Sequence, residues 1–186
     1  NAGNLFNRVH KLNKLNELDI NILIISWRGF SGNSGKPTEK NLYFDAKMSV
    51  KWLKNLGVRD DQIILYGESL GTGVAVELGK DNYFNSIILE SPFTSISKAA
   101  KIYYPYLPIN LLLKDRYDSI DKINNIKKPV LIMHGMKDDI IPFEMGVELF
   151  KKANQPKYSY FTKDDDHMMN FNEKLIDTLR VFIDKN

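Results

Sequence analysis

The sequence predicts an α/β fold with a mainly parallel sheet and helices on both of its faces. Five short apolar runs are predicted as strands, and most of them are nearly continuous in Ile, Leu and Val rather than alternating, as expected for parallel strands that are covered on both sides. Segments with helical spacing of apolar residues separate these runs, and such alternation gives parallel sheets through right-handed crossovers. The expected strands cover residues 20–26, 62–66, 86–90, 129–134 and 157–162.

The helical segments are predicted from the spacing of their apolar residues. Leu5, Val9 and Leu12 recur at helical spacing in the first segment, and Val50 and Leu53 do so in the second. The expected helices cover residues 4–18, 45–56, 72–78, 143–153 and 171–183.

The connection formed by residues 93–128 is longer than a single crossover needs. Its aromatic centre is bounded by Pro105 and Pro108, which predicts a helix, a proline-bounded loop and a second short helix over one face. We interpret this segment as a short lid-like insertion.

Composition limits the function classes. The chain has 186 residues, enough for one domain, which we expect to cover residues 1–186. A content of 43% hydrophobic and 26% charged residues is ordinary for a globular protein and argues against disorder. The net charge of +3 is small and no basic stripe carries interleaved aromatics, so nucleic acid is not expected as a partner. The absence of cysteine excludes disulfides, a thiol nucleophile and Cys-ligated zinc.

The pentapeptide Gly67-Glu68-Ser69-Leu70-Gly71 matches the G-x-S-x-G pattern of a nucleophile elbow. It follows an expected strand and precedes an expected helix, a context that exposes the Ser69 hydroxyl above the sheet. The backbone N–H of Leu70 would then point at an oxyanion formed near Ser69. Side chains at Gly67 and Gly71 are expected to collide where the turn closes. A glycine-rich turn with a surface serine is the alternative.

A serine nucleophile needs a base, and the chain has three histidines. His10 lies in the first amphipathic segment and is expected at the surface. His134 ends the fourth expected strand and is interpreted as a structural residue. His167 follows the fifth strand in a polar loop, and the order Ser, Asp, His along the chain is that of α/β-hydrolases. His167 is therefore the candidate base, with a solvated loop histidine as the alternative.

The acid that orients the base is expected in the turn after His134. Asp138 and Asp139 are neighbours there, and neighbours in a turn point in different directions. Asp138 is our candidate, whereas Asp139 is expected to cap the helix that begins near Phe143.

Two other kinds of site fit less well. Asp164, Asp165 and Asp166 stand before His167 and together could hold a divalent cation, but their spacing matches no regular ligand loop, so no metal is expected. Gly71 and Gly73 follow a strand, yet the third glycine of a dinucleotide fingerprint is absent, and no P-loop pattern occurs. No cofactor is expected.

Several motifs together resemble the α/β-hydrolase superfamily over essentially the whole chain. Within it the chain is similar to small, often membrane-tethered serine hydrolases with a minimal lid, a branch that includes relatives of protein depalmitoylases and lipid esterases. The resemblance implies Ser69 as nucleophile, Asp138 as acid and His167 as base. Its motifs are Trp27-Arg28-Gly29-Phe30 with Gly32, Ser34-Gly35 and Pro37-Thr38-Glu39, then Glu90-Ser91-Pro92-Phe93-Thr94-Ser95, and His134-Gly135-x-x-Asp138.

The chain departs from the family pattern at three places. Aspartates stand before His167 where small residues are usual, and Ser26 occupies a position where an acid is common. Asn1-Ala2-Gly3-Asn4 resembles the end of a segment that follows the family's third strand, which implies the backbone N–H of Asn1 as second oxyanion donor. On this resemblance the central strand is missing, so a fragment is expected, with about three strands and a membrane anchor upstream; the compartment would be the cytoplasm or a membrane surface. A shrunken sheet is the alternative.

The predicted function is hydrolysis of a carboxylic ester or thioester through an acyl-enzyme, with a small-molecule or protein-linked acyl substrate. The Tyr and Leu side chains of residues 93–128 are expected to contact acyl chains, or alternatively to pack the lid onto the core. Two alternatives stay open. One is a catalytically silent binding module on the same fold, and the other is peptidase or acyltransferase chemistry with the same triad.

Overall fold

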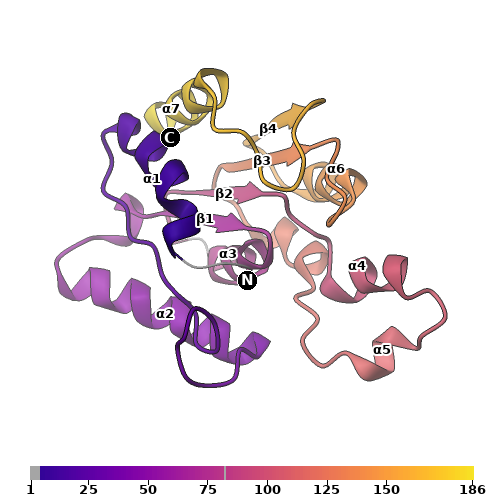
Figure 1. The fold of residues 1–186 in the computed structure, drawn as a ribbon. Helices are drawn as coiled ribbons and strands as arrows, with labels where there is room; N and C mark the ends of the chain where they lie inside the picture. Colours follow the sequence, from indigo (N-terminus) through magenta and orange to yellow (C-terminus); the bar gives the residue numbers. More distant parts are fainter. Residues whose placement is uncertain (1–4, 82) are drawn as a thin grey trace.

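The computed structural model describes residues 5–81 and 83–186 and contains, within these ranges, one sheet of four parallel strands in the order β1-β2-β3-β4 (Figure 1). Ile64 pairs with Ser86, Ile87 with Val130, and Val130 with Lys157. Because all strands are parallel, their carboxyl ends lie at one edge of the sheet, where ligand sites of such folds form. The strands are β1 (Ile64–Glu68), β2 (Ser86–Glu90), β3 (Val130–Gly135) and β4 (Lys157–Thr162).

Helices connect the strands and cover both faces. Thr38 begins the longest helix because its side chain accepts a hydrogen bond from the Asn41 backbone N–H, so this helix starts earlier than its apolar spacing suggested. The α-helices are α1 (Val9–Leu15), α2 (Glu39–Asn55), α3 (Leu70–Gly79), α4 (Ile96–Tyr103), α5 (Ile109–Leu112), α6 (Phe143–Lys152) and α7 (Glu173–Lys185).

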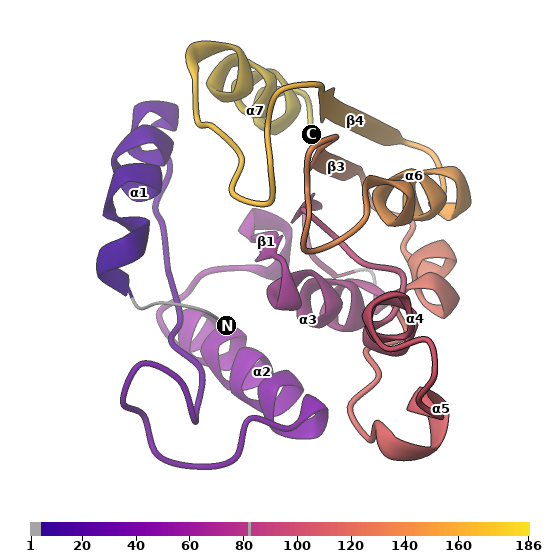
Figure 2. The same cartoon turned by 45° about the vertical axis from the view of Figure 1, so that its right-hand side comes forward.

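The core lies on both sides of the sheet, which explains the continuous apolar runs. Ile88 packs with residues of α7 and with Leu15 of α1 on one face. Its neighbours Ile87 and Leu89 pack with residues of α3 and α6 on the opposite face. Figures 1 and 2 show the resulting layers, with α1 and α7 on one side of the sheet and α2 and α3 on the other. Consecutive residues of β2 face opposite sides of the sheet, and all of them are buried, as predicted.

The predicted strand at residues 20–26 is wrong. Residues 19–26 form neither helix nor strand, and Ile22, Leu23 and Ile24 are exposed. In the part of the chain that the structure describes, β1 pairs with β2 and with no other strand. A run with high strand propensity needs a hydrogen-bonding neighbour to become a strand, and residues 20–26 have none.

The predicted lid-like connection has the expected local structure. Helix α4, a proline-containing loop and the short helix α5 follow one another, and both views show them projecting at the periphery of the molecule (Figures 1 and 2). Among the described residues, none of the helices combines the length and apolarity needed to cross a bilayer.

Candidate active site

Ser69 occupies a strained turn between the last residue of β1 and the first residue of α3. Its φ of 51° and ψ of −117° lie in a region that residues other than glycine rarely adopt. The backbone N–H of Ser69 donates to the Glu90 carbonyl (2.9 Å), and the Ser69 carbonyl accepts from the Thr72 N–H (2.9 Å). One bond ties the turn to β2 and the other ties it to α3. Together they hold Ser69 in its strained conformation.

Of the two glycines of the pentapeptide, Gly67 is required by the close approach of the backbone and Gly71 is not. A Cβ on Gly67 would lie 2.6 Å from the Gly71 carbonyl oxygen and 2.7 Å from the Thr72 Cα, so the strand and helix approach too closely for any side chain. The expected collision at Gly71 is wrong, because a Cβ there meets nothing within 4 Å in the described structure outside its own helix.

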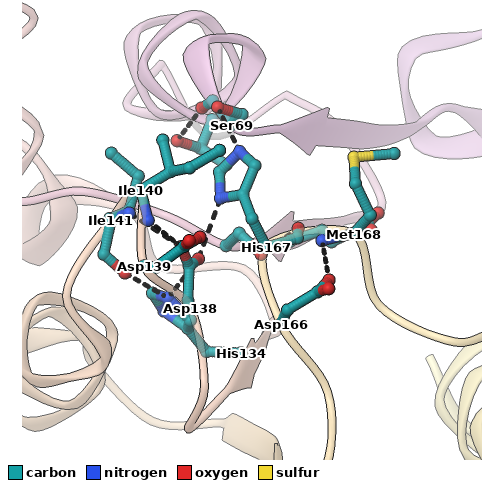
Figure 3. Close-up of polar contacts among 12 residues, drawn as sticks. Ser69, His134, Asp138, Asp139, Ile140, Ile141, Asp166, His167 and Met168 are labelled. Atoms are coloured by element: carbon teal, nitrogen blue, oxygen red, sulfur yellow. Dashed lines mark hydrogen bonds and ion pairs between the residues drawn. The ribbon is translucent and has the colours of Figure 1, made fainter.

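The structure brings Ser69, His167 and Asp138 into one hydrogen-bonded chain (Figure 3). His167 Nε2 lies 3.0 Å from Ser69 Oγ, and His167 Nδ1 lies 2.8 Å from Asp138 Oδ2. The three residues come from three different strand ends, after β1, β3 and β4. His167 and Asp138 are both buried.

Every oxygen of the Asp138 carboxylate accepts hydrogen bonds. Oδ1 accepts from the backbone N–H groups of Ile140 (2.9 Å) and Ile141 (2.7 Å), and Oδ2 accepts from His167 and from His134 Nε2 (3.0 Å). Burial opposes ionisation, but the hydrogen bonds from His134, His167 and Ile141 outweigh it and hold the pKa of Asp138 well below its usual range. Asp138 is therefore an ionised acceptor at neutral pH.

The ionised acid fixes the tautomer of His167. Because Asp138 Oδ2 only accepts, His167 Nδ1 carries the proton and donates it, which leaves Nε2 as an acceptor for the Ser69 hydroxyl. The arrangement is that of a base aimed at a hydroxyl proton.

Asp139 does not cap the next helix. Pro142 is the N-cap of α6 and makes no side-chain cap, so this expectation is wrong. The Asp139 carbonyl instead accepts from the hydroxyl of Tyr103 on α4 (2.5 Å), which also reaches the Ile140 carbonyl (2.9 Å). Of these two neighbours, Asp138 is the one whose carboxylate is hydrogen-bonded to His167 (Figure 3).

Sequence reasoning missed the contact of His134 with the acid. His134 is fully buried in β3, and its Nε2 lies 3.0 Å from Asp138 Oδ2 and 3.1 Å from the Ile141 carbonyl oxygen. Both neighbours are acceptors, so Nε2 donates. The signal was the His-Gly-x-x-Asp spacing, which places a strand-end histidine four residues before a carboxylate across one turn.

A charge cluster beneath the elbow was also missed. Lys11 of α1 contacts the carboxylates of Glu68 and Glu90, and Arg8 adds a bond to Glu68 (2.5 Å). The hydroxyl of Tyr66 donates to Glu90 (2.5 Å). Burial raises the pKa of Glu90, while Lys11 opposes this effect. The cluster attaches α1 to the ends of β1 and β2, and no local sequence pattern reveals pairs so far apart.

The aspartates before His167 have separate partners. Asp164 is paired with Lys137 (3.2 Å), Asp165 accepts from the Thr162 hydroxyl (2.8 Å), and Asp166 accepts from the Met168 N–H (2.8 Å). Within the described residues, no group of three or more metal-ligating side chains gathers closely enough to hold a metal ion. His10 is exposed on α1.

One of the two expected oxyanion donors can be described. Leu70 is the first residue of α3, where a backbone N–H has no acceptor within the helix. The other, Asn1, lies outside the described residues.

Comparison with known proteins places the chain in a family. The model of the prolyl oligopeptidase family (Peptidase_S9) matches residues 11–182. An uncharacterized protein of Mycobacterium tuberculosis is 38% identical over 158 residues, which are 84% of this chain and 56% of that protein. The human alpha/beta hydrolase domain-containing protein 17B is 37% identical over 142 residues, 75% of this chain and 47% of that protein. The chain thus spans about half the length of these curated relatives.

Solved structures share the fold. A Pyrococcus furiosus esterase superposes with a TM-score of 0.75 at 23% identity, covering 94% of this chain and 74% of that one. A Paleococcus ferrophilus monoacylglycerol lipase gives a TM-score of 0.71 at 16% identity, covering 97% and 90%. At such identities the likeness concerns the fold alone. Together with the match of the family model to residues 11–182, it shows that the chain belongs to the prolyl oligopeptidase family and has the α/β-hydrolase fold.

Proposed function

We propose that the protein is a serine hydrolase of carboxylic esters or thioesters, with Ser69 as nucleophile, His167 as base and Asp138 as the orienting acid. The observation that carries the proposal is the hydrogen-bonded chain from Asp138 through His167 to Ser69 on a strained elbow. A strained backbone held at a site of convergent polar groups supports a functional role.

The reaction follows from the proton positions. His167 Nε2 takes the proton of the Ser69 hydroxyl as Oγ attacks the acyl carbon, and Asp138 stabilises the imidazolium that forms. The leaving alcohol or thiol then receives that proton from His167, which leaves the acyl group on Ser69. A water molecule activated by His167 releases the acid and regenerates the serine. The Leu70 N–H, with that of Asn1, is proposed to bind the oxyanion, and loss of one such donor typically costs about 10²–10³ in rate.

Labelling with a fluorophosphonate probe, followed by intact-mass analysis, tests the proposal. We expect one adduct on the full-length protein and none on Ser69→Ala. Ser34→Ala is the matched control, because Ser34 is an exposed serine in the loop before α2 and should not affect labelling. Labelling that persists in a folded Ser69→Ala variant would overturn the assignment of the nucleophile.

The alternative of a silent binding module makes a different prediction. If the folded wild-type protein takes up no probe, the triad is not activated and the binding module becomes the better hypothesis. A screen of acyl esters, acyl thioesters and peptides on a protein that does label separates esterase or thioesterase activity from peptidase activity. Transfer of the acyl group to added alcohols or amines would identify an acyltransferase.

A further inference from the structure

The helices α4 and α5, with the loop between them, form a hairpin that exposes an unusual amount of apolar surface. Of the 12 residues from Ile102 to Leu113, Asn110 is the one polar residue apart from the tyrosines, and none is charged. Tyr106 is 97% exposed, Leu111 86% and Leu112 62%. We call the following six side chains the hairpin surface: Ile102, Tyr104, Tyr106, Leu107, Leu111 and Leu112.

The exposure is a consequence of how the hairpin is anchored. Ile109 is buried, and the Tyr103 hydroxyl bonds to the carbonyls of Asp139 and Ile140. The start of α4 is also fixed, because the Ile96 N–H donates to the Arg116 carbonyl (2.8 Å). These three contacts anchor the hairpin, and the six side chains of the hairpin surface stay exposed. Contiguous exposed apolar surface of this kind marks an interaction site.

The segment that carries the hairpin surface holds charges of one sign, although Asp115 follows it directly and Glu148 of α6 lies against Lys98. Lys98, Lys101 and Lys114 flank it, and no Asp or Glu occurs from Ser95 to Lys114. The whole chain has 26 Lys and Arg against 23 Asp and Glu, so a stretch of 20 residues with three lysines and no acid departs from the average. Lys98 is paired with Glu148, whereas Lys101 and Lys114 are exposed.

We propose that the hairpin surface docks on an anionic lipid bilayer. Leu and Ile side chains enter the boundary of the acyl chains, tyrosines lie at the headgroup level, and Lys101 and Lys114 contact lipid phosphates or carboxylates. A protein partner would need its own carboxylates and a complementary apolar patch, whereas a fluid anionic bilayer supplies both charge and apolar depth to a convex hairpin. Docking here also brings the acid turn, to which Tyr103 is attached, close to the membrane.

A fluorescent label at the centre of the surface tests the proposal directly. The chain has no cysteine, so Tyr106→Cys provides a single labelling position within it for an environment-sensitive dye. With vesicles of phosphatidylcholine and phosphatidylserine we expect increased emission and quenching by spin labels on the acyl chains. Val181→Cys is the matched control, because Val181 is also exposed but lies on α7, and its dye should not respond.

Vesicle sedimentation of full-length variants measures how much the leucines and the lysines each contribute to membrane binding. Replacing Leu111 and Leu112 together by Ser should weaken partitioning about tenfold or more, since each leucine would otherwise bury its side chain in the bilayer. Lys101→Gln and Lys114→Gln should weaken it roughly fivefold each, and on pure phosphatidylcholine these two changes should have little effect. Ser69→Ala should bind vesicles as the wild type does, which separates this proposal from the catalytic one.

Three outcomes would overturn the proposal. One is a dye at position 106 that stays unresponsive and unquenched while the protein sediments with vesicles, because another segment then makes the contact. Another is a response that depends on protein concentration without lipid, which indicates a second copy as occupant. The third is equal binding by the wild type and the Leu111 and Leu112 variant, with unchanged thermal unfolding in both.

Discussion

The hydroxyl of Tyr103 joins the turn around Asp138 to the α4–α5 hairpin. The two regions differ in the burial and the hydrogen bonding of their side chains. In the turn, His134 and Asp138 are buried and both carboxylate oxygens accept two hydrogen bonds. In the hairpin, apolar side chains such as Tyr106 and Leu111 are largely exposed. A buried polar network holds a proposed reaction centre in one geometry, whereas an exposed apolar surface is suited to a partner outside the fold.

The comparison predicts that substitutions in the turn alter activity and stability, while substitutions in the hairpin alter neither. The largest effect is expected for Asp138→Asn. An amide at this position no longer favours the Nδ1–H tautomer of His167, and the corresponding change in a Ser-His-Asp triad of another hydrolase lowers kcat about 10⁴-fold. Kinetics with an acyl ester that the wild type cleaves measures the loss, and a loss below about tenfold would contradict the role of Asp138.

Asp138 also makes stability depend on pH in a predictable direction. Its folded-state pKa is depressed, so its contribution to stability is present above the unfolded value of about 3.9 and is lost as pH falls through the folded pKa. The difference in unfolding free energy between wild type and Asp138→Asn should therefore be large at neutral pH and shrink below about pH 4. Urea unfolding at several pH values measures this difference; one that stays constant with pH would show that Asp138 is not held ionised.

Gly135→Ala is expected to destabilise the turn by about 1–3 kcal/mol. A Cβ at Gly135 would lie 2.2 Å from the Asp165 carbonyl oxygen and 2.6 Å from that of Asp166, so the loop that carries His167 must move. Gly71→Ala is the matched control, because a Cβ there meets nothing within 4 Å and alanine is the better helix former. Thermal unfolding should separate the two variants; equal stability would mean that the loop adapts freely.

His134→Phe removes one donor from Asp138 while keeping a buried ring. Because the hydrogen bond from His134 lowers the pKa of Asp138, its loss should raise that pKa toward the ordinary range. The acid-induced loss of stability then begins at a higher pH than in the wild type. His134→Gln supplies an amide donor and should restore part of the difference, which a purely steric role of His134 would not give.

The smallest effects are expected in the hairpin. Leu111→Ser and Tyr106→Ser should change the free energy of unfolding by no more than about 0.5 kcal/mol, because both side chains are exposed and make little contact with the core. Cleavage of a small soluble acyl ester should also be unchanged. A loss of several degrees in Tm for either variant would show that these side chains pack against the rest of the protein. The hairpin would then not differ from the turn in its contribution to stability.

Much of the fold followed from local patterns. The strands 86–90 and 157–162 were predicted with the bounds that β2 and β4 have, and the helix that became α6 starts at the predicted Phe143. In β2 every residue is buried, and burial on both faces explains its apolar run, whereas β4 is only partly buried. Residues 20–26 are as rich in Ile and Leu as β2, but within the described residues no strand lies beside them, and composition alone does not reveal this.

The proposed site was predictable where its residues follow strands in the order of a known motif. Ser69, Asp138 and His167 were selected from residue type, context and resemblance, and the structure brings them together. Their catalytic roles stay a proposal, as does the single domain over residues 1–186. The extra hydrogen bond from His134 to Asp138 and the contacts of Lys11 with Glu68 and Glu90 were not predicted, because each depends on distances across strands and helices.

The sequence by itself indicated most of the helices and strands, the strand-to-helix turn at Ser69 and the candidate residues, because strand runs, helical spacing and glycine positions are local properties of the chain. Only the tertiary structure decided which carboxylate meets His167, which glycine is required at the elbow, and which apolar residues stay outside the core. Asp138 reaches His167 because the backbone N–H groups of Ile140 and Ile141 hold its carboxylate in place. Leu89 is buried and Leu111 exposed because burial depends on what the fold places against a side chain, which residue type does not specify.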